Sequence, residues 1–206
     1  MRVGGLLLAG GRSRRFGSEK AVKPLGDGVM MDFPLRILDE TCLAVAVSVQ
    51  AGSVAEAHAQ ALGLACLYDD PEDADGPLAG IRRGLSWALD QGFDWLAIAP
   101  CDAPTLAKNH YVSLIDAVER GAAAAIGQSS HGPEPLVSLW PVPVGLTGVD
   151  TALNNGAHPA IRDVLTAVDA VPVDLAGYDG RNVNTPGDHA EAVRTEPSLS
   201  RLQPEP

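Results

Sequence analysis

Residues 3–20 read VGGLLLAGGRSRRFGSEK, an apolar run that ends in two glycines and is followed by a basic segment. A short apolar run of this kind, stopped by Ala-Gly-Gly, is typical of a buried strand that leads into a loop. Gly10, Gly11 and Gly17 let the backbone turn sharply and approach a ligand closely. The stretch therefore predicts a first buried strand over residues 3–8, followed by a loop that binds a polyphosphate.

The cations of this loop supply charge for an oxyanion; they are Arg12, Arg14, Arg15 and Lys20. The spacing is not that of a Walker loop, which requires GxxxxGK followed by Ser or Thr, because Ala21 follows the lysine. It is not GxGxxG either. The alternative interpretation is that the cations form a solvated basic surface beside a glycine turn. Glycines and a lysine together after the first strand favour a phosphate-binding loop.

Apolar runs and amphipathic helical segments alternate along the rest of the chain. This alternation predicts an α/β fold with a parallel sheet, helices on both faces, right-handed crossovers, and ligands at the carboxyl ends of the strands. We expect strands over 3–8, 43–49, 64–68, 94–99, 122–126, 134–142 and 170–175, and helices over 32–42, 53–62, 78–92, 108–120, 148–155, 160–168 and from the N-cap Thr185 onward.

Length and composition predict one domain, over residues 1–194, with residues 195–206 as a flexible tail. A net charge of -11 argues against a surface that follows nucleic acid phosphates. No apolar run is long enough for a membrane span, and the arginines follow the first apolar run, unlike the order in a signal peptide. Three separated cysteines, Cys42, Cys66 and Cys101, fit reduced thiols, so we expect a cytoplasmic protein.

A second group of candidate residues begins with PCDAP, residues 100–104. Asp102 directly follows an apolar strand, which places its carboxylate at the ligand-binding edge of the sheet, where it could hold Mg²⁺ against a triphosphate. Asp69 and Asn184 could join it. The alternative is that Asp102 is a turn residue before a proline-rich loop.

Four motifs together resemble the molybdenum cofactor guanylyltransferase family, in order and spacing, up to about Val193. They are LAGGRSRRFGSEK (8–20), DDPEDADGPLAGI (69–81), PCDAP (100–104) and NVNTP (182–186). The resemblance implies a Rossmann-like, three-layer α/β/α fold with a mostly parallel sheet. It also implies transfer of GMP from GTP to the phosphate of molybdopterin, with Mg²⁺ as cofactor, giving the guanine dinucleotide and pyrophosphate.

The same resemblance implies roles for individual residues. Main chain at the end of the first strand would meet the guanine and ribose, Lys20 and Arg15 would neutralise phosphate, and Asp69 would contact the nucleotide. Asp102 would bind nucleotide and Mg²⁺, and Asn184 would complete the metal site. Ser48 stands about where family members use an Asn to touch the nucleotide. The nucleotide-binding set is thus Leu8, Ala9, Gly10, Gly11, Lys20, Ser48, Asp69 and Asp102.

On the acceptor side, GPEPLVSLWP (132–141) resembles the family's QPLxAL strand, which lies beside the acceptor pocket. Arg162 and Arg181 are candidates for contacts with the acceptor phosphate, with a surface role as the alternative. Phe16 and Glu19 replace the usual Met and Asp of the glycine-rich motif. The histidines show no metal-ligand spacing, and we expect each to lie on the solvated surface; they are His58, His110, His131, His158 and His189.

Three alternatives to guanylyl transfer stay open. They are cytidylyl transfer to the same cofactor, another small-molecule nucleotidyl transfer, and a non-catalytic nucleotide-binding regulator or adaptor for molybdoenzyme assembly. Cytidylyl relatives carry LAAG where this chain has LAGG, which favours GTP over CTP and ATP. Molybdoenzyme chaperones are candidate partners, no nucleic acid or membrane is expected to bind, and the chain is expected to be a monomer or a weak homo-oligomer.

Overall fold

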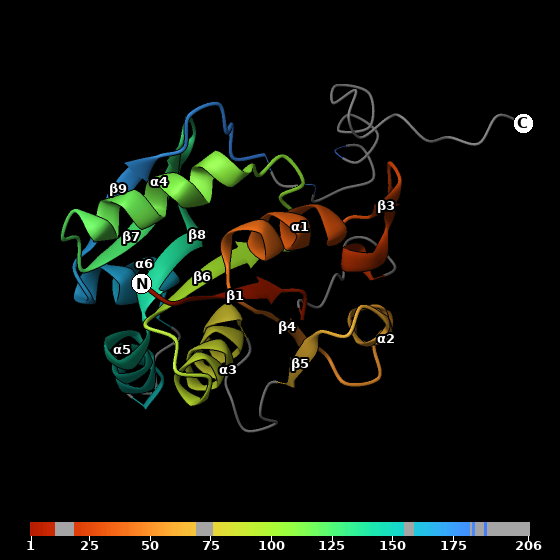
Figure 1. Cartoon of the computed structure of the whole chain (residues 1–206), viewed down its shortest axis with the longest axis horizontal. Coiled ribbons are helices and arrows are strands. Elements are labelled where there is room, and N and C mark those ends of the chain that lie inside the picture. The colour runs from red at the N-terminus through yellow and green to blue at the C-terminus, as the bar shows by residue number, and fades with distance from the viewer. Residues whose placement is uncertain (11–18, 69–75, 155–158, 182, 184–187, 189–206) are drawn as a thin grey trace, which may run out of the picture.

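A seven-stranded sheet in the order β5-β4-β1-β6-β8-β7-β9 forms the middle layer of the molecule (Figure 1). The computed structural model describes residues 1–10, 19–68, 76–154, 159–181, 183 and 188. The strands are β1 (Val3–Leu8), β4 (Val45–Val49), β5 (Ala65–Tyr68), β6 (Trp95–Pro100), β7 (Ala124–Ser129), β8 (Gly132–Pro141) and β9 (Ala170–Asp174). The mostly parallel α/β sheet predicted from the alternation is confirmed.

Strand β1 lies inside the sheet, between β4 and β6, and it is apolar on both faces. It pairs in parallel with β4 on one side and with β6 on the other, and Leu8 stands in register with Ser48 and with Pro100. A strand buried on both faces has to be covered by helices on both sides, as is usual in parallel sheets. The first strand predicted from residues 3–8 is therefore confirmed at those bounds.

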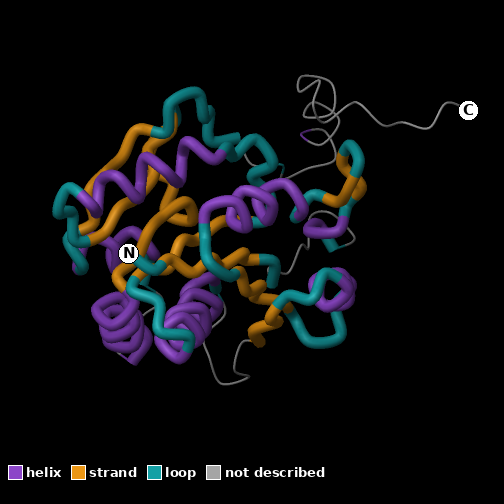
Figure 2. The backbone as a smooth tube through the Cα atoms, in the orientation of Figure 1, coloured by secondary structure: helices purple, strands orange, loops and turns teal. Residues whose placement is uncertain are grey.

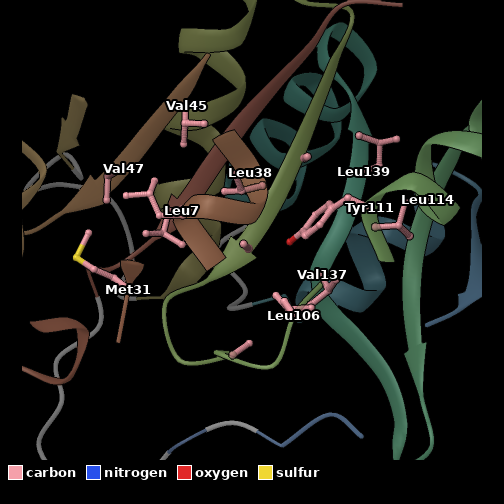
Figure 3. Packing of buried hydrophobic residues seen from close by; sticks show 14 of the residues in the cluster. Leu7, Met31, Leu38, Val45, Val47, Leu106, Tyr111, Leu114, Val137 and Leu139 are labelled. Atoms are coloured by element: carbon pink, nitrogen blue, oxygen red, sulfur yellow. The ribbon is translucent and has the colours of Figure 1, made fainter. Parts of the chain in front are cut away.

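Alternate residues of β1 point into different cores. Leu7 packs on the side of helices α1 (Asp32–Thr41), α2 (Val54–Ala61) and α4 (Lys108–Glu119). Figure 3 shows this cluster, in which Leu7 and Leu38 lie near Val47, with Tyr111 closing it toward β8. The Tyr111 hydroxyl is fully buried and donates a hydrogen bond of 2.7 Å to the carbonyl of Ile98.

The opposite face of the sheet carries helices α3 (Pro77–Asp90), α5 (Val142–Asn154) and α6 (Ile161–Ala167). Leu6 points into this second core. Helix α3 approaches β1 closely because it presents glycines there: a Cβ on Gly84 would lie 2.4 Å from Leu6 Cδ2, and one on Gly80 would lie 2.7 Å from Ser48 Oγ. The two faces are distinct in Figure 1, where α1 and α4 lie on one side of the sheet and α3 and α5 on the other.

The structure differs from the sequence expectations in three places. Strand β8 runs antiparallel to both neighbours, because only a short turn joins it to β7. A small hairpin of β2 (Pro24–Leu25) and β3 (Gly28–Val29), which no expectation included, precedes α1. Helix α5 begins at Val142, six residues before its expected start. The helix expected from Thr185 and the tail 195–206 lie outside the described residues.

Helix caps follow the expected chemistry in one case and depart from it in another. Ser53 caps α2, since its Oγ accepts a hydrogen bond of 3.0 Å from the amide of Glu56. Asp32, the first residue of the helix expected over 32–42, is the first helical residue of α1 and not its N-cap, and its Oδ2 accepts from the amide of Val29 at 2.8 Å. This bond ties the helix to the β2–β3 hairpin.

One edge of the sheet collects the ends of the strands that matter for function. The carboxyl ends of β1, β4, β6, β7 and β9 lie there, and so does the start of β8, because that strand runs the opposite way. The chain path along these ends can be followed in Figure 2. In the part of the chain that the structure describes, no helix combines the length and apolar character needed to cross a membrane.

Candidate functional site

The nucleotide side of the sheet edge is built from main chain at the end of β1. The ladder continues one residue beyond the strand, since the Ala9 amide donates to the carbonyl of Ser48 at 2.9 Å and the Cys101 amide donates to that of Leu8 at 3.1 Å. Gly10 follows and ends this described segment. Leu8, Ala9 and Gly10 are thus held at the edge between the ends of β4 and β6, as predicted for residues that offer bare backbone to a ligand.

Ser48 lies at the end of β4 and is buried, with 3% of its surface exposed. Its hydroxyl faces helix α3 and the glycine segment, because a Cβ built on Gly80 or Gly10 would lie 2.7 or 3.5 Å from Ser48 Oγ. Its place beside Gly10 fits the nucleotide contact predicted for it, and that contact stays a prediction.

Lys20 and Asp102 form an ion pair at the same edge. Lys20 begins the short 3₁₀ helix η1 (Lys20–Val22), and Asp102 lies two residues after β6. Lys20 Nζ is 2.5 Å from Asp102 Oδ2, and the two side chains are 11% and 18% exposed. Partial burial shields such a pair from solvent, so it is stronger than a surface ion pair. The structure thus brings together Lys20 of the glycine-rich motif and Asp102 of PCDAP, which are 82 positions apart in the sequence.

Asp102 has the chemistry of a ligand for a hard divalent cation. Its carboxylate lies at a sheet edge, is partly exposed to solvent, and already forms an ion pair with the Lys20 ammonium. The main-chain carbonyl of Asp102 accepts a 2.9 Å hydrogen bond from the amide of Val183. The residue immediately before Asn184, the second predicted metal ligand, is therefore attached to the Asp102 loop, although Asn184 itself lies outside the described residues.

Glu19 anchors the end of the glycine-rich segment, a role that the sequence analysis missed. Its two carboxylate oxygens accept hydrogen bonds from the first amides of α2, Val54 at 2.7 Å and Ala55 at 2.9 Å. A carboxylate satisfies unpaired amides and favours the positive end of the helix dipole. Glu19 therefore fixes the position of its neighbour Lys20. No local pattern signals this contact, because its partners lie 35 and 36 residues away.

Several predicted site residues lie outside the described residues, and their roles stay predictions: Gly11, Arg15, Asp69 and Asn184. Of the two acceptor candidates, Arg162 is exposed on α6, and Arg181 follows β9. The Arg181 guanidinium pairs with Asp179, with 2.8 Å between Nε and Oδ2.

The expectation that every histidine lies on the surface is wrong for His110, which is 3% exposed. Its Nδ1 accepts from the Ala107 amide at 3.0 Å, so the proton sits on Nε2, which faces the carbonyl of Ala176 at 3.3 Å. Burial, opposed by that carbonyl, lowers the pKa of His110 and keeps the ring neutral. His58 pairs with Asp32 at 2.7 Å. His158 and His189 lie outside the described part of the chain.

The three cysteines are free thiols, as expected. Cys101 adjoins the site residue Asp102, but burial first and the Asp102 charge second raise its pKa to about 12. A thiol with such a pKa stays protonated and is a poor nucleophile. Within the described residues, no group of three or more His, Cys, Asp or Glu side chains could hold a metal ion. Asp102 would therefore need oxygen ligands from outside this set, such as substrate phosphate, water or Asn184.

On the far side of Asp102 lies a second polar group, which we call the β8-side cluster: Ser129, Glu134 and Tyr178. Ser129 ends β7, Glu134 begins β8, and Tyr178 follows β9. The charge of Asp102 raises the pKa of both Glu134 and Tyr178, although burial is the larger cause for each. Glu134 lies in the segment 132–141 that resembles the family's acceptor-side strand, but the sequence analysis gave it no role of its own. Ser129 and Tyr178 were missed because they come from other parts of the chain and belong to no motif with a recognised spacing.

The fold and this edge define the chain as an α/β nucleotidyltransferase, and the comparisons with known proteins agree with that class. The crystal structure of molybdopterin-guanine dinucleotide biosynthesis protein A from Archaeoglobus fulgidus superposes with a TM-score of 0.74 at 20% identity, over 97% of this chain and all of that one. The 2-C-methyl-D-erythritol 4-phosphate cytidylyltransferase from Thermus thermophilus superposes with a TM-score of 0.71 at 14% identity, over 96% and 98% of the two chains. At these identities the likeness shows the fold.

The sequence comparison is more specific. Residues 5–172 match the MobA-like NTP transferase domain, and the chain belongs to that family. A protein from Rhodobacter capsulatus named molybdenum cofactor guanylyltransferase is 37% identical over 195 residues, which cover 93% of this chain and 95% of the relative. The resemblance drawn from the four motifs is therefore confirmed.

Proposed function

We propose that this protein transfers GMP from GTP to the phosphate of molybdopterin and releases pyrophosphate. The 2.5 Å contact between Lys20 and Asp102, at the same sheet edge as the main chain that ends β1, carries the proposal. It supplies one cation for phosphate and one carboxylate for a metal at the carboxyl edge, where ligands of such sheets bind. The relative from Rhodobacter capsulatus supports the choice of substrates.

The reaction is a displacement at the α-phosphorus of GTP. An oxygen of the molybdopterin phosphate forms the new bond to that phosphorus, and the bond to the β-phosphate breaks with its electron pair leaving on pyrophosphate. The attacking phosphate is already ionised at neutral pH, so no general base is required. The protein contributes alignment of two anions and compensation of their charge.

The residues at the edge divide this work. Main chain at Leu8, Ala9 and Gly10 positions the nucleoside, and Lys20 leaves Asp102 to contact the phosphates of the bound nucleotide. Asp102, with Asn184, would hold Mg²⁺, which when bound neutralises charge on the triphosphate. Glu19 holds Lys20 in place through α2. Arg15 and Asp69 are the further contacts proposed for the nucleotide.

The alternatives differ in base or in activity. Similarity in fold to a cytidylyltransferase does not decide between CTP and GTP, since it rests on 14% identity. Gly10, the glycine of LAGG that is alanine in the LAAG of cytidylyl relatives, leaves room at the edge where those relatives carry a methyl group, which supports a purine. A non-catalytic regulator would have no need for the Lys20–Asp102 pair. The proposal also includes a cytoplasmic location, molybdoenzyme chaperones as partners, and a monomer or weak homo-oligomer.

One assay tests the activity and the base together. The protein is incubated with molybdopterin, Mg²⁺ and GTP, CTP or ATP in turn, and pyrophosphate release is measured. We expect release with GTP, and calorimetric titration should rank GTP above CTP and ATP in affinity. Equal or faster turnover with CTP would assign the chain to cytidylyl transfer, and nucleotide binding without turnover would favour the regulator.

A further inference from the structure

Asp102 lies in the middle of the sheet edge, and the two sides of it are built from different strands. On one side are the ends of β1 and β4 with Lys20, where the proposed function places GTP. On the other side are the end of β7, the start of β8 and the segment after β9. In a displacement at one phosphorus the two substrates approach from opposite directions. If the proposed function holds, the β8 side therefore faces the acceptor.

Glu134 is held at this edge by a bulge and by Ser129. Register between β7 and β8 shifts from Ile126↔Ser138 to Gly127↔Glu134, so three residues of β8 have no partner in the pairing there. Bulges of this kind redirect side chains and are common beside functional sites. Ser129 Oγ donates a 2.8 Å hydrogen bond to Glu134 Oε1. The carboxylate also lies against the backbone after β9, since a Cβ on Gly180 would be only 2.2 Å from Glu134 Oε1.

Tyr178 is buried beside this carboxylate, with 3% of its surface exposed. Its ring packs against His110, with 5.4 Å between centroids, and its amide donates to the carbonyl of Leu175 at 2.9 Å. Among the described residues its hydroxyl has no hydrogen-bond partner. Leaving a buried hydroxyl without a partner is costly, so such a group in a native protein calls for an explanation.

The surroundings of this hydroxyl indicate what kind of partner fits. The charges that raise the pKa of Tyr178 beyond the effect of burial are those of Glu134, Asp102 and Asp179. Asp102 and Asp179 are paired with Lys20 and Arg181, whereas Glu134 forms no ion pair within the described residues. Glu134 therefore disfavours a phosphate beside it, because like charges repel strongly where burial lowers the dielectric. A half-buried carboxylate instead prefers N–H donors, and the neutral phenol can donate to an adjacent oxygen or nitrogen.

We propose that Glu134 and the Tyr178 hydroxyl bind the polar edge of the acceptor's pterin ring. The carboxylate accepts N–H groups of the aminopyrimidinone, and the hydroxyl donates to the neighbouring ring oxygen or nitrogen. This contact fixes the ring on the β8 side and leaves the acceptor phosphate free to reach Asp102 and Lys20. The inference rests on the proposed function for the identity of the acceptor.

Tyr178→Phe is the deciding variant, and Tyr111→Phe is its matched control. Both tyrosines are buried, but the Tyr111 hydroxyl donates to Ile98 whereas that of Tyr178 has no partner among the described residues. Binding of molybdopterin without GTP is measured by equilibrium dialysis, GTP binding by calorimetry, and the melting temperature by circular dichroism. Tyr178→Phe should keep or raise the melting temperature and weaken molybdopterin binding by about 5- to 10-fold, with GTP binding unchanged. Tyr111→Phe should lower the melting temperature and leave both affinities intact.

Unchanged molybdopterin affinity in Tyr178→Phe would overturn the inference, whatever its melting temperature, because the hydroxyl would then serve only a water or the fold. An equal loss of GTP affinity would also overturn it, by placing Tyr178 on the nucleotide side. Glu134→Gln provides a second variant, which should weaken molybdopterin binding by roughly 10-fold or more and leave GTP binding unchanged. These binding measurements are independent of turnover. A wild-type protein that binds molybdopterin through Tyr178 but releases no pyrophosphate would refute the proposed function and leave this inference standing.

Discussion

The two sides of the Asp102 carboxylate differ in what they present to a ligand. Toward β1 the edge offers bare main chain at Ala9 and Gly10 and the ammonium of Lys20. Toward β8 it offers the carboxylate of Glu134 and the hydroxyl of Tyr178. One side therefore suits the phosphates of an anion, and the other suits a neutral ring with N–H groups. In the proposed function, the single Asp102 carboxylate between them would serve both substrates.

Mutations on the two sides should therefore change different kinetic parameters. Changes toward β1 should act on GTP, and changes toward β8 should act on the acceptor. Changes at Asp102 should act on the chemical step that joins them. Variants on each side of Asp102 test whether the effects on GTP and on the acceptor are separate.

Asp102→Ala should have the largest effect. Losing the carboxylate removes charge compensation at the reacting phosphates, so kcat should fall by a factor on the order of 1,000 or more. The melting temperature should change little, because Asp102 is at a partly solvated edge and not in the core. Pyrophosphate release and circular dichroism test both statements, with the exposed helical Asp116→Ala as a control. Near-normal turnover, or a large loss of stability, would contradict the assignment.

Lys20→Ala should come next, with kcat/KM for GTP reduced by at least ~100-fold, the scale of removing one electrostatic donor from an active site. Arg12→Ala, at a variable position of the glycine-rich motif, should cost about 1 kcal/mol or less, as for an exposed charge. Steady-state kinetics with GTP as the varied substrate compares the two variants. Equal and small effects in an active transferase would mean that this segment is only a turn with a basic surface.

Gly80→Ala tests whether the nucleotide side requires the close approach of helix α3 to Ser48 at the end of β4. Its new methyl group would lie 2.7 Å from Ser48 Oγ, so Ser48 has to move, and the KM for GTP should rise about 5-fold, equivalent to roughly 1 kcal/mol. The acceptor KM should stay unchanged. In a Ser48→Ala background the same substitution should have a smaller effect, because the nearest colliding atom is gone and only Leu8 Cδ2 at 3.1 Å and the Cβ of residue 48 at 3.3 Å remain close. Fully additive effects in the double variant would show that the collision is not the cause.

The smallest expected effect concerns how the stability of the fold depends on pH through His110, whose ring packs against Tyr178. Burial lowers the pKa of His110 below its usual 6.5, so between these two pKa values the unfolded chain binds a proton that the folded chain does not. His110 therefore stabilises most above pH 6.5, and this advantage shrinks as the pH falls toward its folded pKa. Urea denaturation at pH 7.5 and 5.5 should show a larger loss for the wild type than for His110→Gln. His58→Gln, at a partly exposed position, should behave like the wild type.

Much of the fold could be predicted from the sequence because its signals are local. The apolar run of β1, the Ser53 cap of α2 and the glycine that follows α3 each mark an element boundary within a few residues. The antiparallel direction of β8 could not be predicted in this way. It depends on the short turn between Ser129 and Gly132, which the expected strand bounds at residues 126 and 134 left inside a longer loop.

The same distinction, between residues with a local sequence signal and residues without one, applies to the candidate site. Lys20 and Asp102 were predicted because each stands at a strand end within a recognisable motif, and the structure joins them. Glu19 and Glu134 stand within quoted motifs but were given no role, because their contacts, with the start of α2 and with Ser129, are not encoded by those motifs. Ser129 and Tyr178 were missed because a lone polar residue carries no signal. His110 was wrongly placed on the surface for the same reason, since its burial follows from contacts with the segment after β9.

The Lys20–Asp102 pair also bears on how a chain of net charge -11 receives two anionic substrates. Before the nucleotide arrives, the ammonium acts as an internal counterion, so the reaction centre presents a neutral pair instead of a bare negative charge. In the proposed function, an incoming triphosphate would compete for that ammonium and draw it away. The carboxylate would then regain its full charge and could hold a divalent cation. Metal and nucleotide should therefore bind with positive coupling, each raising the affinity for the other by the same factor.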